Sequence, residues 1–197
     1  MSSKPIAHIS VILQNEATGS LAEAYNTVKD GNNNVENLYL AMSQTPDAIV
    51  PADAHYMALL HNPDNPLDPS LSELVATYVA ILCQCEYAIA NHGANFRMYL
   101  SNDARADAIL SILADDDLSK IENDQMRAAL EYTRKLSLTP ESVQASDIET
   151  LRTAGFCDKG ISYIIQIAAS FGYWARMING LGTRLGAQIG MMGNPDT

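Results

Sequence analysis

The sequence predicts an all-α protein folded as a single domain. The 197 residues are 47% hydrophobic and 18% charged, which is apolar enough to bury a core. Apolar residues recur at helical spacings of three and four, whereas the alternation typical of strands is nearly absent. No repeat, linker or low-complexity tract divides the chain. We therefore expect one domain over 1–197, with 1–18 and 187–197 as peripheral arms.

Breaks in the helical pattern delimit the elements. The polar run that begins at Asp30 ends the first helix, and the Pro/Asn/Asp cluster 62–66 is the clearest loop of the chain. Pro140 stops a later helix, and Gly155 ends another as a natural left-handed cap. The sequence thus predicts helices over 19–29, 35–42, 51–60, 104–113, 124–136, 145–153 and 158–179, and a long helical segment over 71–99.

The segment 71–99 carries one continuous apolar stripe, whose members are spaced alternately by four and three residues. Its members are Leu71, Val75, Tyr78, Leu82, Cys85, Ile89, His92, Phe96 and Tyr99. Cys85 and His92 are two helical turns apart, so they share a face at a separation of roughly 10 Å. A histidine beside a cysteine can stabilise the thiolate or move its proton. The alternative is that Cys85 is an inert buried thiol and His92 an ordinary core histidine.

Glu73 opens the same segment and has two interpretations. In the first, Ser70 and Glu73 form a capping box, with the Glu73 carboxylate bonded to the Ser70 backbone N–H. In the second, Glu73 accepts a proton near Cys85. A straight helix would place Glu73 about 18 Å from Cys85 and about 28 Å from His92. The second interpretation therefore requires the segment to fold back near 82–84. The continuous stripe speaks against that break, although two antiparallel helices can preserve the pattern.

The number of cysteines and the first residues of the chain indicate in which cellular compartment the protein is expected. The first five residues lack the apolar core of a secretion signal, and an odd cysteine count argues against a disulfide framework. We expect a reducing, cytoplasmic location. On a continuous helix, Cys83 and Cys85 point apart. Cys157 is interpreted as structural, with Asp158 as the N-cap of the last helix.

Charge and motif spacing exclude several functions. The 12 basic and 23 acidic residues give a net charge of −11, which disfavours nucleic acid and anionic membranes as partners. The four histidines show no i, i+4 pair, so no zinc-binding helix is indicated. We expect no metal and no cofactor. The glycines at 180, 182 and 186 follow a helix rather than a strand, which excludes a phosphate loop. The low charged fraction favours a buried interface between copies of the chain.

Three motifs resemble a known superfamily. They are Leu71-Ser-Glu73-Leu-Val, then Cys85-Glu-Tyr-Ala88, then His92. Together they resemble the alkylhydroperoxidase D-like and carboxymuconolactone decarboxylase superfamily, most closely its peroxidase-related branch. Two further stretches, 130–158 and 171–182, are similar to the middle region and final helix of that branch. The resemblance covers roughly 38–186.

The resemblance implies an all-α, oligomeric fold with a thiol peroxidase relay. In that relay a Glu and a His help to deprotonate one cysteine of a Cys-x-x-Cys pair, peroxide oxidises the second cysteine, and the first resolves it as a disulfide. Carried over, the residues are Glu73, Cys85 as the first cysteine, and His92. The second cysteine falls on Ala88, which has no sulfur, so the dithiol cycle cannot run unchanged.

Three functions remain open at this point. The first is an antioxidant one-cysteine hydroperoxidase that uses Cys85, tuned by His92 and Glu73, and is reduced by an external thiol. The second is an acid–base enzyme of the decarboxylase type, in which His92 and Glu73 act on a small carboxylated or lactone substrate. The third is a non-catalytic oligomeric scaffold in which these residues only pack.

Overall fold

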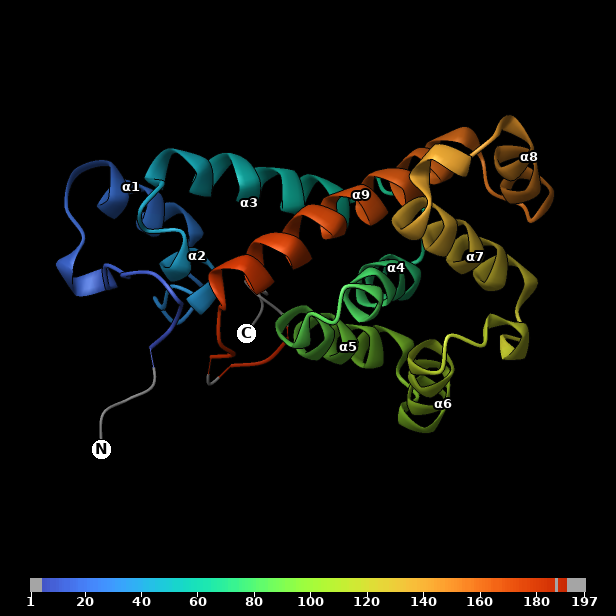
Figure 1. Cartoon of the computed structure of the whole chain (residues 1–197), viewed down its shortest axis with the longest axis horizontal. Coiled ribbons are helices and arrows are strands. Elements are labelled where there is room, and N and C mark those ends of the chain that lie inside the picture. Colours follow the sequence, from blue (N-terminus) through green and yellow to red (C-terminus); the bar gives the residue numbers. More distant parts are fainter. Residues whose placement is uncertain (1–4, 187, 191–197) are drawn as a thin grey trace.

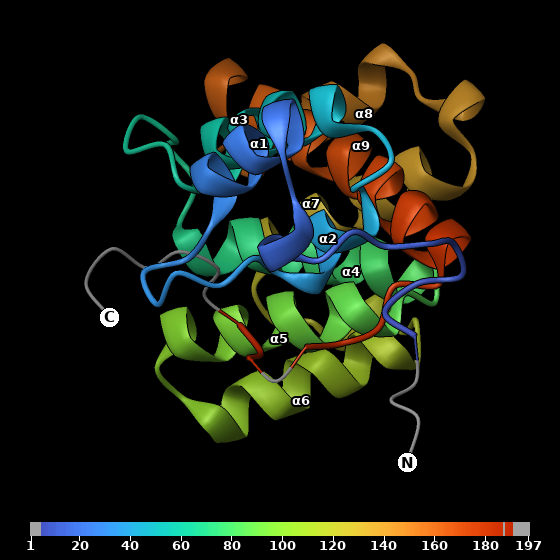
Figure 2. The ribbon, with the colours of Figure 1, turned by 90° about the vertical axis from the view of Figure 1, so that its left-hand side faces the viewer.

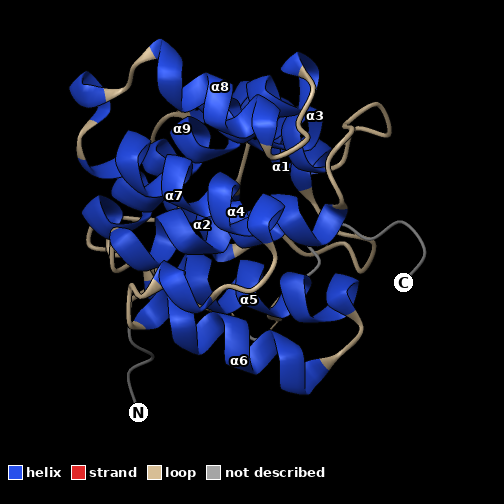
Figure 3. Cartoon of the chain, turned by 90° about the vertical axis from the view of Figure 1, so that its right-hand side faces the viewer, coloured by secondary structure: helices blue, strands red, loops and turns tan. Residues whose placement is uncertain are grey.

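The computed structural model describes residues 5–186 and 188–190, and these residues form nine α-helices, three short 3-10 turns and no strand. The predicted all-α fold is thus confirmed, as Figure 3 shows. The helices are α1 (Gly19–Val28), α2 (Asn37–Ala41), α3 (Pro46–Leu60), α4 (Pro69–Leu82), α5 (Glu86–Leu100), α6 (Asp103–Ala114), α7 (Asp124–Leu138), α8 (Ala145–Thr153) and α9 (Asp158–Leu181). None of the helices in these ranges is long and apolar enough to cross a bilayer.

Most helix boundaries lie within two residues of the predicted ones, and α3 is the exception. It begins five residues earlier than expected, at Pro46 rather than Pro51. Proline is favoured in the first turn of a helix, where a backbone N–H has no partner to lose. Pro46 takes that role, and Pro51 lies inside the helix one turn later.

The long segment 71–99 is two helices, so the continuous stripe was misleading. Helix α4 ends at Leu82 and α5 begins at Glu86, and Gln84 between them has a left-handed φ of 52°. The Cys85 N–H bonds to the Ala80 carbonyl at 2.9 Å, which closes the turn. The stripe survives the reversal because both helices keep a buried face, with Val75 on one and Phe96 on the other fully buried.

One interpretation of Glu73 and one predicted N-cap are also wrong. The N-cap of α4 is Asp68, whose carboxylate accepts from the Ser70 N–H at 2.8 Å, so Glu73 is not part of a capping box. The N-cap of α9 is Cys157, and Asp158 is the first helical residue. Asp158 is instead an ion-pair partner of Arg152. Cys157 is exposed.

Helix α4 lies at the centre of the molecule. It is buried from Ser70 to Ala80 and packs against α5, α7 and α9. Figure 1 shows α9 crossing beside α3, while α5 and α6 lie on the opposite side of α4. In Figure 2, α1 and α3 form the layer above α4, and α6 covers the outer side of α5. The core therefore surrounds α4, whereas α5 keeps an exposed face that includes Met98 and Tyr99.

The two terminal segments contact the helices where the structure describes them. The His8 N–H donates to the Leu181 carbonyl at 2.7 Å, and the Ile12 N–H donates to the Ser43 hydroxyl at 3.0 Å. The Gly190 N–H donates to Asn91 Oδ1 at 2.9 Å. The remaining parts of the expected arms, 1–4, 187 and 191–197, lie outside the described residues.

Candidate active site

A buried carboxylate and a buried histidine face each other across α4 and α5. Glu73 Oε2 lies 2.7 Å from His92 Nδ1, and Asn95 Nδ2 donates to Glu73 Oε1 at 3.2 Å. The exposed fractions of Glu73 and His92 are only 2% and 7%. The reversal at Gln84 makes this contact possible, because it returns α5 antiparallel along α4. The segment therefore folds back, as the second interpretation of Glu73 requires, and the contact it creates joins Glu73 to His92.

The pairing leaves one ring nitrogen of His92 available. A carboxylate only accepts hydrogen bonds, so Nδ1 carries the hydrogen that faces Glu73. Nε2 is then the nitrogen left to accept or deliver a proton. The ring itself is held edge-on between Phe171 and Tyr56, at centroid distances of 4.5 Å and 6.1 Å. Such fixed orientation is what an acid–base histidine requires.

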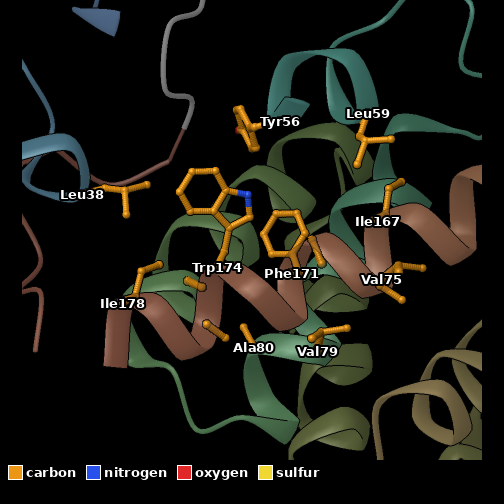
Figure 4. Close-up of a cluster of buried hydrophobic side chains, with 14 of the residues drawn as sticks. Leu38, Tyr56, Leu59, Val75, Val79, Ala80, Ile167, Phe171, Trp174 and Ile178 are labelled. Atoms are coloured by element: carbon orange, nitrogen blue, oxygen red, sulfur yellow. The ribbon is translucent and has the colours of Figure 1, made fainter. Parts of the chain in front are cut away.

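His92 lines a small cavity with aromatic walls. The space open to the centre of a water molecule is about 20 Å³, enough for roughly one water. Six rings form most of its lining: Tyr39, Tyr56, Tyr87, His92, Phe171 and Trp174. The remaining lining residues are Leu38, Ala88, Asn91 and Ile178. Figure 4 shows Phe171 and Trp174 on α9 facing Tyr56 of α3, with Leu38 at the far side.

Cys85 lies outside this lining, whereas Ala88 is part of it. Cys85 is fully buried as the N-cap of α5. Burial raises the pKa of its thiol, and this outweighs the backbone N–H groups of Ala88 and Tyr87, which lower the pKa. A raised pKa leaves less thiolate at neutral pH, so the environment suppresses the nucleophilic form. The structure thus places Glu73 and His92 together and keeps the sulfur of Cys85 apart from the cavity.

A second hollow lies next to the cavity and shares Tyr39 and Tyr56 with it. Its volume, measured in the same way, is about 180 Å³, and its acidic lining residues are Asp30, Glu36 and Asp53. The Tyr39 hydroxyl donates to Asp53 Oδ1 at 2.7 Å. Burial, with Asp30 nearby, raises the pKa of Glu36. The hollow that adjoins the cavity on this side is therefore lined by carboxylates.

Tyr56 also connects the cavity to His61. The Tyr56 hydroxyl lies 3.0 Å from His61 Nε2. Burial raises the pKa of Tyr56 well above its ordinary value and lowers the pKa of His61. Both changes favour the neutral forms, so this pair is a hydrogen-bonded neutral contact at the edge of the site. The described residues contain no group of three or more His, Cys, Asp or Glu side chains that could hold a metal ion.

Sequence reasoning missed several residues of this site. Asn95 lies one helical turn after His92 on α5, and a polar residue at that position of a buried face was a usable signal. Phe171 and Trp174 occur in a stretch that is similar to the family's final helix, yet nothing in the spacing indicated a cavity wall. Tyr56 and Tyr39 carry no signal of their own.

Solved structures resemble this chain over most of its length. One is an uncharacterized peroxidase-related protein from Ralstonia eutropha, described as an alkylhydroperoxidase AhpD core, with TM-score 0.80 and 27% identity over 94% of this chain and 95% of the other. A peroxidase-related protein from Silicibacter also gives TM-score 0.80, at 18% identity over 95% of both chains. A debrominase in complex with 2,3,4-tribromopyrrole gives TM-score 0.71, at 15% identity over 92% of this chain and 94% of the other. No family model and no curated protein matches the sequence.

Fold and site together define a helical protein built around a buried Glu–His pair on an antiparallel helix hairpin. The chain is a member of the alkylhydroperoxidase D-like and carboxymuconolactone decarboxylase superfamily. The resemblance inferred from Glu73, Cys85 and His92 is therefore confirmed at the level of superfamily and fold.

Proposed function

We propose that this protein is an acid–base enzyme in which His92, oriented by Glu73, exchanges a proton with a small substrate whose reacting group occupies the water-sized aromatic cavity. The observation that carries the proposal is the 2.7 Å contact between Glu73 and His92 at the wall of that cavity. A buried histidine with one nitrogen fixed by a carboxylate presents the other nitrogen in a defined direction. This corresponds to the decarboxylase type of chemistry, with a lactone or carboxylated compound as substrate.

The aromatic lining is consistent with a small ring compound as substrate. Binding sites for small molecules are mostly apolar and contain a few placed polar groups, as this cavity does with His92 and Asn91. The debrominase of similar fold was solved with a small bromopyrrole bound. That complex supports the view that this helical fold accommodates a small ring.

Deuterium exchange from solvent tests the proton-transfer step by itself, apart from the rest of the reaction. The protein is incubated in D₂O with a panel of small lactones and ketones, and deuterium next to the carbonyl is measured by mass spectrometry. We expect exchange with the natural chain and with Cys85→Ser, and loss of at least a hundredfold with His92→Gln. Equal exchange by His92→Gln, or none above buffer with any compound, would overturn the proposal.

A one-cysteine hydroperoxidase is the second candidate. Cys85 is the N-cap of α5, where the N–H groups of Tyr87 and Ala88 partly offset the rise in thiol pKa that burial causes, and similar folds are described as peroxidase-related. In this mechanism peroxide would oxidise Cys85 to a sulfenic acid, and an external thiol would reduce it. Peroxide consumption by the natural chain and by Cys85→Ser separates the candidates, because only this second mechanism predicts a loss in the variant.

A further inference from the structure

One hydrogen-bond donor in the cavity wall has no acceptor among the residues that the structure describes. The indole Nε1 of Trp174 is buried and unpartnered, and the whole side chain is only 4% exposed. Buried tryptophan N–H groups usually find a partner, and leaving one unpaired costs about 1–3 kcal/mol. An unsatisfied donor at this depth therefore calls for an explanation.

The position of this donor points to a ligand. Trp174 lines the same cavity as His92, and Figure 4 shows the indole nitrogen on the edge of the ring that faces Tyr56 and Phe171. Phe171 in turn packs against His92 at a centroid distance of 4.5 Å. A ligand that accepts from Trp174 is thus held in the same small space as His92.

The charges around the cavity select against an anion. None of the described residues that line it is Lys or Arg. Glu73 lies behind His92, and the neighbouring hollow is lined by Asp30, Glu36 and Asp53. A carboxylate ligand would be desolvated beside this negative charge with no cation to pair with. An uncharged acceptor avoids that cost.

From the donor, the aromatic walls and the missing cation we infer that the water-sized cavity takes the carbonyl oxygen of a small uncharged compound, which accepts the Trp174 indole N–H in place of a water. The carbon skeleton of the compound then extends past His92 along the aromatic walls. The inference rests on the proposed function, and it narrows the substrate class from carboxylated compounds to neutral ketones or lactones. Trp174 is then the residue that determines this specificity.

Nuclear magnetic resonance offers a direct test, because Trp174 is the only tryptophan of the chain. In ¹⁵N-labelled protein the single indole N–H signal reports on this donor alone. Cyclopropyl methyl ketone and cyclopropanecarboxylate have nearly the same size and differ mainly in charge. We expect the ketone to move the indole proton signal downfield in a saturable way, and the carboxylate to leave it unchanged. An indole signal that the ketone does not move, or that both compounds move equally, would overturn the inference.

A pair of variants measures the contribution of the donor. Trp174→Phe keeps an aromatic ring and removes the N–H, so the dissociation constant of the ketone should rise about tenfold. Tyr173→Phe is the matched control, since Tyr173 is half exposed on the same helix, and it should leave affinity unchanged. Equal affinity of the natural chain and Trp174→Phe would contradict the assigned role. The same titration is repeated with His92→Gln, so that ketone binding and proton transfer are measured separately. If the natural chain binds the ketone but exchanges no deuterium, only the acid–base function is contradicted.

Discussion

Glu73 and His92 are 19 residues apart in the sequence, and their side chains meet at 2.7 Å in the core. This contact joins the start of α4 to the middle of α5. It exists because three residues, Cys83–Cys85, reverse the chain direction with one left-handed residue, Gln84. The fold and the candidate chemistry therefore depend on the same short turn.

The Glu73–His92 contact should appear as a coupling free energy in protein stability. We expect Glu73→Leu and His92→Leu each to lower the free energy of unfolding by about 2–3 kcal/mol, because each leaves a buried polar partner unsatisfied. The double variant should cost at least about 1 kcal/mol less than the sum of the single variants. Urea denaturation of the four proteins measures this. Additive effects would show that the pair does not interact in solution.

Ala88 offers a gain-of-function prediction. Ala88 lines the cavity beside His92, and a cysteine there would restore Cys-x-x-Cys with Cys85 at the start of α5. We expect Ala88→Cys to consume peroxide at least tenfold faster than the natural chain, in the presence of a dithiol reductant, since a cavity thiol near a helix N-terminus is activated. Ala88→Ser controls for size and polarity. If the cysteine and serine variants are equally inactive, the site does not support the family's relay.

Cys157 and Cys85 should differ strongly in reactivity. Cys157 is exposed, whereas Cys85 is buried and burial raises its thiol pKa. At pH 7.5 we expect iodoacetamide to alkylate Cys157 at least tenfold faster than Cys85. Because the pKa is raised, alkylation of Cys85 should stay slow through the ordinary titration range near about 8.5 and increase only above it. Mass spectrometry of timed samples resolves the sites. Rapid alkylation of Cys85 at neutral pH would instead favour the peroxidase candidate.

Two glycines near the end of α9 should respond in opposite directions to replacement by alanine. Gly182 has a φ of +61°, and a Cβ there would clash with the imidazole of His8. Gly180 is helical, and a Cβ there would meet nothing within 4 Å. We expect Gly182→Ala to destabilise the protein by about 1–3 kcal/mol and Gly180→Ala to stabilise it by up to about 1 kcal/mol. Thermal unfolding compares them, and a similar effect of both would refute the packing of His8 against Gly182.

Most of the fold could be predicted from the sequence because helix-forming periodicity and helix-breaking residues are local signals. The cluster 62–66, Pro140 and Gly155 mark real helix ends, and six helices lie within two residues of their predicted bounds. The reversal at Gln84 has no such signal. No glycine or proline stands there, and the left-handed conformation of Gln84 is stabilised by the packing of α5 on α4 rather than by its own preference.

The candidate site could be predicted only in part, because its contacts, like the reversal at Gln84, depend on packing between segments. The family resemblance identified Glu73, Cys85 and His92, but spacing alone put Glu73 and His92 about 28 Å apart on a straight helix. Besides α5, which carries the motif, the cavity walls come from α2, α3 and α9, and nothing local indicates that Tyr56 or Trp174 faces His92. Burial, which decides the pKa of Cys85, is likewise a property of the assembled core.

The most direct test of the central claim compares His92→Gln with Cys85→Ser on one substrate. With the lactone or ketone that exchanges fastest in D₂O, we expect Cys85→Ser to retain the rate of the natural chain within about twofold. His92→Gln should lose at least a hundredfold. The opposite pattern, with exchange lost in Cys85→Ser and kept in His92→Gln, would contradict the assignment of His92 as the reacting group.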